Sequence, residues 1–276
     1  MAESFGRRLW AAVEDRGGLC VGVDPSPEVV AHFEREDSLE SVELVALRLV
    51  EAASSTASVV KPQVAFFERF GSRGYAVLER VIAEARAAGL LVIADAKRGD
   101  IGSSNEGYAA TWLDEGSPLA SDAVTVSPYL GVDSLEPFRR RCQRGRGLFV
   151  LAATSNPEGR SLQGARTAEG VRVFDDVLAR VATWNEGADG VGGAGVVLGA
   201  SAPRGEFALR ELRGPVLVPG VGAQGGGLDQ VRRLLEGVDR RSIVVSLSRA
   251  LVESGTSPRH LISSMSRWRD ALSENL

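Results

Sequence analysis

Short apolar runs recur along the whole chain, and each run stops at a polar residue, a glycine or a proline. Runs of this kind, without alternating polar positions, are typical of strands buried on both faces of a parallel sheet. They predict strands at 19–23, 57–60, 90–94, 123–126, 147–153, 194–198, 215–218 and 242–245. Apolar residues with helical spacing predict helices at 1–18, 39–55, 75–88, 104–113, 133–142, 168–186, 203–212 and 247–272.

Strands that alternate with helices in this way predict a (β/α)8 TIM barrel, in which the helix before the first strand is an extra N-terminal element. The length of 276 residues fits this fold, and no linker or repeat divides the chain, so we expect a single domain over residues 1–276. A doubly wound open sheet is the alternative, but no dinucleotide-binding glycine pattern follows the first strand. The pattern gives no role to the polar stretch at 156–168.

Composition narrows the possible partners and the compartment. The net charge is −4 at pH 7, so no basic field favours a nucleic acid partner. No apolar run reaches the roughly 18 residues that a membrane span requires, and the N-terminus lacks the apolar core of a signal peptide. Cys20 and Cys142 lack metal-ligand spacing and suggest reduced thiols, so we expect a cytoplasmic protein.

The most informative stretch follows the third predicted strand, where Asp95, Lys97 and Asp100 come close together. Positions i and i+2 of a strand share a face, so Asp95 and Lys97 should point the same way, and Asp100 should lie on the turn that follows. Taken alone, such a group is most often a solvated cluster of loop charges. The rest of the chain changes that interpretation.

Lysine usage makes the stretch more specific. Lys61 and Lys97 are the only lysines, so arginine supplies the other 30 of the 32 basic residues. Arginine has a very high pKa and rarely gives up a proton, whereas lysine can act as a proton donor. Both lysines lie near predicted strand ends, which favours a chemical role for them.

In a barrel, the carboxyl ends of all the strands meet at one mouth, where active sites lie. This arrangement brings together Asp24, Lys61, Asp95 and Lys97, and we expect a hydrogen-bonded row of alternating charges in that order. Ser155 follows the fifth predicted strand at the same mouth. The alternative is a set of strand-end charges that water solvates at the rim.

A phosphate site is predicted on the other side of the mouth. Pro219 begins a glycine-rich segment at 219–227 after the seventh strand, and glycines let backbone N–H groups approach an anion closely. Arg249 opens the helix after the eighth strand, where its guanidinium and the helix N-terminus can reach the same phosphate. The loops after strands seven and eight are the usual phosphate position of this fold.

These segments resemble those of a known family. The sequence DAKRGDI at 95–101 is similar to the D-x-K-x-x-D-I signature of orotidine 5′-phosphate decarboxylase, and KPQVAFFE at 61–68 resembles the second-strand motif of its longer bacterial subgroup. The segment PGVGAQGG at 219–226 is similar to the phosphate-gripping loop of the family. The resemblance extends over nearly the whole chain, from about residue 19 to residue 251.

The resemblance implies a homodimer that converts orotidine 5′-phosphate to uridine 5′-phosphate and carbon dioxide, the last step of pyrimidine synthesis, without a cofactor or a metal. It assigns Lys97 as the proton donor to the ring carbon that loses its carboxylate. Asp95 and Lys61 would hold this lysine in the charge network, and Asp24 would meet the ribose.

By the same resemblance, Asp100, Ile101 and Ser104 would enter the site of the neighbouring subunit. Each active site would then lie at the subunit interface and take residues from both chains.

The other substrate contacts are also implied by the resemblance. Ser155 would contact the pyrimidine, and Gln224 would bridge the base and the phosphate. Pro219 and Arg249 would line the phosphate end of the substrate. The position of Arg249 rests on its spacing from the strand rather than on a local motif.

Three other functions fit parts of the pattern. A metal-dependent sugar-phosphate decarboxylase or aldolase of the same superfamily shares the D-x-K-x-x-D pattern, but it needs an acidic ligand where this chain has Lys61. A Schiff-base aldolase would use Lys97, yet flanking carboxylates keep an amine protonated and non-nucleophilic. A nucleotide-binding homodimer without turnover is the alternative from another class, and the complete set of chemical groups disfavours it.

Overall fold

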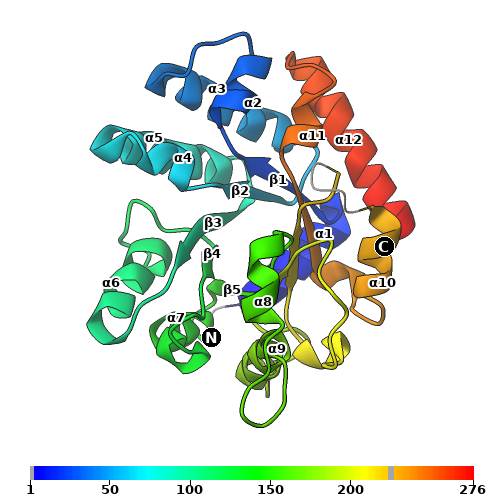
Figure 1. Ribbon diagram of the computed structural model, residues 1–276. Coiled ribbons are helices and arrows are strands. Elements are labelled where there is room, and N and C mark those ends of the chain that lie inside the picture. The colour runs from blue at the N-terminus through cyan, green and yellow to red at the C-terminus, as the bar shows by residue number, and fades with distance from the viewer. Residues whose placement is uncertain (1–2, 223–226) are drawn as a thin grey trace.

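The structure, a computed structural model, describes residues 3–222 and 227–276. Eight parallel strands form a closed barrel, in which each strand pairs with the next and β8 pairs with β1 (Figure 1). The strands are β1 (Leu19–Val23), β2 (Val59–Pro62), β3 (Leu91–Arg98), β4 (Ala123–Val126), β5 (Gly147–Ala153), β6 (Ala194–Leu198), β7 (Val216–Pro219) and β8 (Ile243–Leu247). The predicted (β/α)8 barrel is confirmed, and β1, β4, β5 and β6 have the predicted bounds.

Helices surround the barrel and cover the outer faces of its strands (Figure 1). The α-helices are α1 (Phe5–Arg16), α2 (Pro27–His32), α3 (Leu39–Ala53), α4 (Ala65–Glu68), α5 (Gly71–Ala87), α6 (Gly102–Leu113), α7 (Glu136–Cys142), α8 (Arg160–Gln163), α9 (Val173–Trp184), α10 (Leu228–Leu234), α11 (Arg249–Val252) and α12 (Pro258–Asn275). Short 3-10 helices are η1 (Val132–Leu135), η2 (Pro157–Gly159), η3 (Leu209–Leu212) and η4 (Arg240–Ser242). None of the described helices is long and apolar enough to cross a membrane.

The extra N-terminal helix closes the amino end of the barrel. Phe5 and Leu9 of α1 are fully buried, and they pack with inward-facing residues such as Cys20 of β1 and Phe149 of β5. The rings of Phe5 and Phe149 meet edge to face, with centroids 6.0 Å apart. Figure 1 shows α1 crossing behind the strands. The carboxyl end of the barrel is therefore the end that holds the pocket.

The predicted helix at 203–212 is present only as the 3-10 helix η3, so this prediction is wrong over most of its length. The reason is a tertiary contact that competes with helical hydrogen bonding. The carboxylate of Asp175 in α9 accepts the backbone N–H groups of Glu206 and Phe207, at 2.9 and 3.0 Å. These bonds hold the segment as a loop on α9.

The predicted C-terminal helix at 247–272 is divided into α11 and α12. Gly255 has a φ of +129°, outside the helical region. Ser257 then caps α12, and Pro258 occupies the first turn, where its missing N–H costs nothing. The cap and the proline were visible in the sequence, and they outweigh the continuous apolar spacing.

Candidate active site

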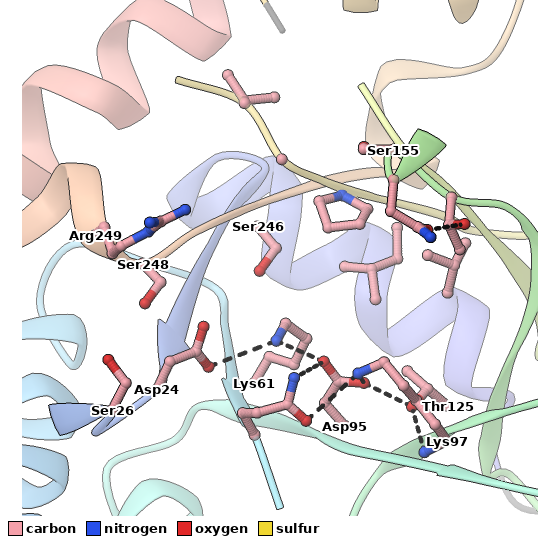
Figure 2. A pocket seen from close by; sticks show the side chains of 18 of the residues that line it. Asp24, Ser26, Lys61, Asp95, Lys97, Thr125, Ser155, Ser246, Ser248 and Arg249 are labelled. Atoms are coloured by element: carbon pink, nitrogen blue, oxygen red, sulfur yellow. Dashed lines mark hydrogen bonds and ion pairs between the residues drawn. The ribbon is translucent and has the colours of Figure 1, made fainter. Parts of the chain in front are cut away.

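A pocket of about 500 Å³ opens at the carboxyl ends of the strands (Figure 2). Every strand of the barrel, or the residue just after it, contributes to its wall. In strand order these contributions are Asp24, Lys61, Asp95 with Lys97, Thr125, Leu151, Val197, Leu217 and Ser246. The walls are therefore polar on the side of β1 to β4 and mostly apolar on the side of β5 to β7, which suits a ring that is flat and partly apolar.

Four charges form a row along the polar side of the pocket, in the order that the sequence predicted (Figure 2). Lys61 Nζ lies 3.7 Å from Asp24 Oδ1 and 2.8 Å from Asp95 Oδ2. Lys97 Nζ lies 2.6 Å from Asp95 Oδ1. The side chain of Lys61 is only 6% exposed, whereas that of Lys97 is 46% exposed, so Lys97 is the ammonium that a ligand can reach.

Asp95 is the centre of the row, and each of its oxygens accepts one charged and one neutral donor. Oδ1 accepts hydrogen bonds from Lys97 Nζ and from Thr125 Oγ1, the latter at 2.8 Å. Oδ2 accepts hydrogen bonds from Lys61 Nζ and from Gln63 Nε2, the latter at 3.2 Å. A buried carboxylate is stable only when its lone pairs are satisfied in this way.

The network fixes the ionisation of its buried members. Burial alone would raise the pKa of Asp95, but the charges and hydrogen bonds of Lys61 and Lys97 outweigh it and hold that pKa well below its usual range. Burial alone would lower the pKa of Lys61, but the carboxylates of Asp24 and Asp95 raise it above its usual range. Asp95 and Lys61 are therefore both charged throughout the physiological pH range.

Asp95→Asn is expected to lower the free energy of unfolding by about 3 to 5 kcal/mol at neutral pH, because it leaves the buried Lys61 ammonium short of a counter-charge. The folded pKa of Asp95 lies below its unfolded value of about 3.9, so its contribution is complete above that pH and is lost as the pH falls through the folded value. The pH dependence that Lys61 causes runs the other way, because its pKa is raised in the folded protein. Its contribution to the free energy of unfolding is complete below about pH 10.4 and is lost as the pH rises through the folded pKa.

Denaturant unfolding of wild type and Asp95→Asn at a series of pH values measures this effect. The difference in free energy of unfolding between wild type and Asp95→Asn should stay constant from about pH 5 to pH 9 and become smaller in stronger acid. Asp189→Asn is the matched control, since its side chain is 89% exposed and its loss should leave stability nearly unchanged. A difference that varied between pH 6 and pH 8 would contradict the assignment.

Two residues of the network, Gln63 and Thr125, were missed as site residues in the sequence. Gln63 lies two positions after Lys61, so the same i and i+2 rule that paired Asp95 with Lys97 could have found it. Thr125 is the one polar residue in the apolar run at 123–126, and it is 1% exposed. A lone hydroxyl in a buried strand was the available signal.

Two buried polar atoms at the pocket have no hydrogen-bond partner among the described residues. They are Oδ1 of Asp24 and Oγ of Ser155. Nearly all buried polar atoms in proteins are paired, so these two atoms beside a cavity are available for hydrogen bonds to a ligand. Ser155 packs directly against Gly199, since a Cβ added to Gly199 would lie 2.3 Å from Ser155 Oγ.

The phosphate end predicted from the sequence is partly described. Pro219 and Arg249 both line the pocket, and Figure 2 shows Arg249 at the opposite end from Ser155. Gly220 and Gly222 have φ values of +89° and +77°, a region that favours glycine and lets the loop turn sharply after β7. Gln224 lies outside the described residues.

Three predicted site residues do not line the pocket of their own chain: Asp100, Ile101 and Ser104. Asn105 fixes the turn that carries Asp100, since its side chain bonds the backbone N–H of Asp100 at 2.9 Å. Ile101 is 62% exposed, and Ser104 is exposed on the first turn of α6. This is the orientation that a contribution to another subunit would require.

Within residues 3–222 and 227–276, no group of three or more His, Cys, Asp or Glu side chains is arranged to hold a metal ion. On the second strand, the ammonium of Lys61 lies between the carboxylates of Asp24 and Asp95.

A (β/α)8 barrel whose pocket is lined by this charge row, by Gly220 and by Arg249 has the arrangement of a barrel enzyme that acts on a phosphorylated substrate. The chain belongs to the orotidine 5′-phosphate decarboxylase / HUMPS family, whose sequence model matches residues 17–262.

Named relatives agree with this family. The orotidine 5′-phosphate decarboxylase of Salinispora tropica is 47% identical over 254 residues, which cover 92% of this chain and 91% of the relative. That of a Nocardioides species is 52% identical over 234 residues, which cover 83% of this chain and 85% of the relative. A crystal structure from Streptomyces avermitilis, named as a candidate orotidine 5′-phosphate decarboxylase, superposes with a TM-score of 0.93 at 44% identity, over 99% of this chain and 96% of that one.

Proposed function

We propose that this chain converts orotidine 5′-phosphate to uridine 5′-phosphate and carbon dioxide, the final step of de novo pyrimidine nucleotide synthesis, with Lys97 as the proton donor. Family membership supports the reaction. The observation that carries the mechanism is the exposed Lys97 ammonium, held 2.6 Å from the buried Asp95 carboxylate at the pocket wall.

The proposed chemistry follows from the charges. Loss of carbon dioxide breaks the bond between the ring carbon and its carboxylate and leaves the electron pair on the ring carbon. The Lys97 ammonium stabilises this charge as it develops and then donates a proton to the same carbon. The neutral amine recovers its proton from water. Asp95 and Asp100 lie near the substrate carboxylate in this scheme and disfavour its charge before it leaves.

Substrate binding is assigned to polar groups that line the pocket. Asp24, whose buried Oδ1 accepts no hydrogen bond from the described residues, would accept one from a ribose hydroxyl, and the Ser155 hydroxyl would bond the pyrimidine. Pro219, Gln224 and Arg249 would surround the phosphate. Binding of the phosphate, remote from the reacting carbon, can then help to position the ring against Lys97.

Arg249→Ala is expected to raise KM about 10²-fold or more and to change kcat less, because a guanidinium holds a phosphate by charge-assisted hydrogen bonds. Calorimetry with uridine 5′-phosphate and with uridine separates the two parts of the ligand. The variant should lose affinity for the nucleotide only, since the nucleoside has no phosphate. Equal losses for both ligands would place Arg249 elsewhere in the site.

We also propose a homodimer in which Asp100, Ile101 and Ser104 complete the neighbouring site. The loops after β3 and β4 support it, because Ile101, Tyr129 and Leu130 on these adjacent loops are 62%, 75% and 52% exposed. Large apolar side chains exposed together are typical of an interface.

A cytoplasmic location is the remaining part of the proposal. It is supported by Cys20 and Cys142, the only cysteines of the sequence, which are both free thiols.

The direct test is the loss of absorbance of orotidine 5′-phosphate in the presence of EDTA. Turnover that EDTA leaves unchanged supports the proposed reaction. Turnover that EDTA abolishes would indicate a metal-dependent reaction and would contradict the proposed mechanism. Tight binding of uridine 5′-phosphate without turnover would indicate a nucleotide-binding protein instead.

A further inference from the structure

We propose that Thr125 is a positioning residue for the reaction, whose hydroxyl holds both the backbone of Lys97 and one oxygen of Asp95. Lys97 then has one orientation in which its ammonium faces the pocket. This inference rests on the proposed role of Lys97 as the proton donor.

The need for Thr125 arises from an irregularity between β3 and β4. Ala94 pairs with Val124, but the next pair is Arg98 with Val126, four positions further on β3 and two positions further on β4. The surplus residues of β3 form a bulge opposite Thr125, and a bulge leaves backbone groups without their ladder partners. Here the backbone N–H of Lys97 donates to Thr125 Oγ1 at 3.0 Å. A side-chain hydroxyl therefore replaces the missing backbone acceptor.

The backbone of Lys97 is itself unusual. Its φ is +47°, in the left-handed region that residues other than glycine rarely adopt. Such a conformation persists only where its surroundings hold it. On the C-terminal side, Ser127 N–H donates to the carbonyl of Arg98 at 2.8 Å, and Gly99 passes so close that an added Cβ would lie 2.4 Å from the Ser127 carbonyl. At Lys97 itself, Thr125 makes the contact.

The hydroxyl also links the backbone of Lys97 to its own ammonium. Thr125 Oγ1 accepts the Lys97 N–H, so the hydroxyl proton of Thr125 is free to point to Asp95 Oδ1, which lies 2.8 Å from Thr125 Oγ1. The same carboxylate oxygen accepts Lys97 Nζ at 2.6 Å, which closes a ring of three hydrogen bonds (Figure 2). Thr125 is 1% exposed and β-branched, so few rotamers are open to it. The ring therefore fixes both ends of the lysine.

Thr125→Val, which keeps the shape and removes the hydroxyl, should lower kcat about 10- to 100-fold, because a small misplacement of a reacting group costs this much. The affinity for uridine 5′-phosphate should change by less than about threefold, since the hydroxyl acts on Lys97. Thr125→Ser restores the hydroxyl and should recover kcat to within about fivefold of wild type. Thr125→Ala provides a second hydroxyl-free variant in case the valine does not fold.

Thr56→Val is the matched control. Thr56 is also a buried threonine, 2% exposed, and its hydroxyl donates to the Ala52 carbonyl at 2.9 Å, outside the pocket. This variant should lose stability and keep kcat, which separates positioning from a general structural effect.

A spectroscopic measurement is independent of turnover. Because the chain has only two lysines, labelling with 15N-lysine gives one backbone amide signal for Lys61 and one for Lys97, and Lys97→Arg identifies the second. In wild type, the Lys97 amide should exchange slowly with solvent, although its side chain faces the pocket. In Thr125→Val, this signal should move and exchange faster, while the Lys61 signal stays in place.

The outcomes distinguish this inference from the proposed function. Normal kcat in Thr125→Val or Thr125→Ala, together with an inactive Lys97→Ala, would overturn the role of Thr125 alone. A serine variant as slow as the valine variant, a loss confined to KM, or a rapidly exchanging Lys97 amide in wild type would also overturn it. An active Lys97→Ala would instead overturn the proposed mechanism.

Discussion

Lys97→Ala is expected to lower kcat for orotidine 5′-phosphate by at least about 10⁴-fold. The variant loses a proton donor, which contributes about 10²- to 10⁴-fold in enzymes, and it loses a fixed positive charge beside the developing carbanion, which contributes a similar factor. The affinity for uridine 5′-phosphate should fall much less, because the ribose and phosphate contacts remain. The absorbance assay and calorimetry measure the two quantities separately.

Two further variants define what Lys97 supplies. Lys97→Arg keeps the positive charge but cannot readily give up a proton, so it should remain at least about 10²-fold slower than wild type. Arg98→Lys changes the neighbouring cation, which pairs with Glu68 outside the pocket, and should be close to wild type. If Lys97→Ala turned over within tenfold of wild type, Lys97 would not be the proton donor.

The second large effect is expected at Asp100. Asp100→Asn should lower kcat/KM about 10²- to 10⁴-fold, because it removes a charge that the proposed scheme places beside the substrate carboxylate of the neighbouring subunit. Asparagine preserves the side-chain oxygen that accepts the Ile101 N–H at 2.8 Å, so the turn should be retained. Steady-state kinetics with thermal unfolding as a check on folding measures this loss.

Mixing two inactive chains tests whether the site is shared. Lys97→Ala and Asp100→Asn place their defects in different halves of the proposed site, so each mixed dimer has one intact site. After random subunit exchange, about a quarter of wild-type activity should return. A mixture of Lys97→Ala with Lys97→Arg is the control: it has both defects in the same half and should recover nothing beyond the activity of Lys97→Arg. No recovery despite proven exchange would place Asp100 in the site of its own chain.

The row of charges could be predicted because it depends on two simple rules. Side chains two apart on a strand share a face, and the carboxyl ends of parallel strands converge. These rules brought Asp24, Lys61, Asp95 and Lys97 together from segments far apart in the sequence. The contrast with an arginine-rich background made the two lysines conspicuous.

Other features depended on contacts that no local pattern records. Most of the predicted helix at 203–212 is a loop, because the carboxylate of Asp175, on another helix, accepts the N–H groups of Glu206 and Phe207. The third strand continued through Asp95 and Lys97 to Arg98, although the apolar run ended at Ala94.

The sequence by itself determined the order of strands and helices, the chemical groups at the barrel mouth and the resemblance to a decarboxylase family. The resemblance implied that Asp95 and Lys97 serve their own site and Asp100 the neighbouring one. Only the tertiary structure decided that Asp95 and Lys97 line the pocket of their own chain and that Asp100 lies outside it. It also decided that Lys97 adopts a left-handed backbone beside Thr125. The reason is physical: the bulge is set by the register between β3 and β4, and that register exists only once the barrel has closed.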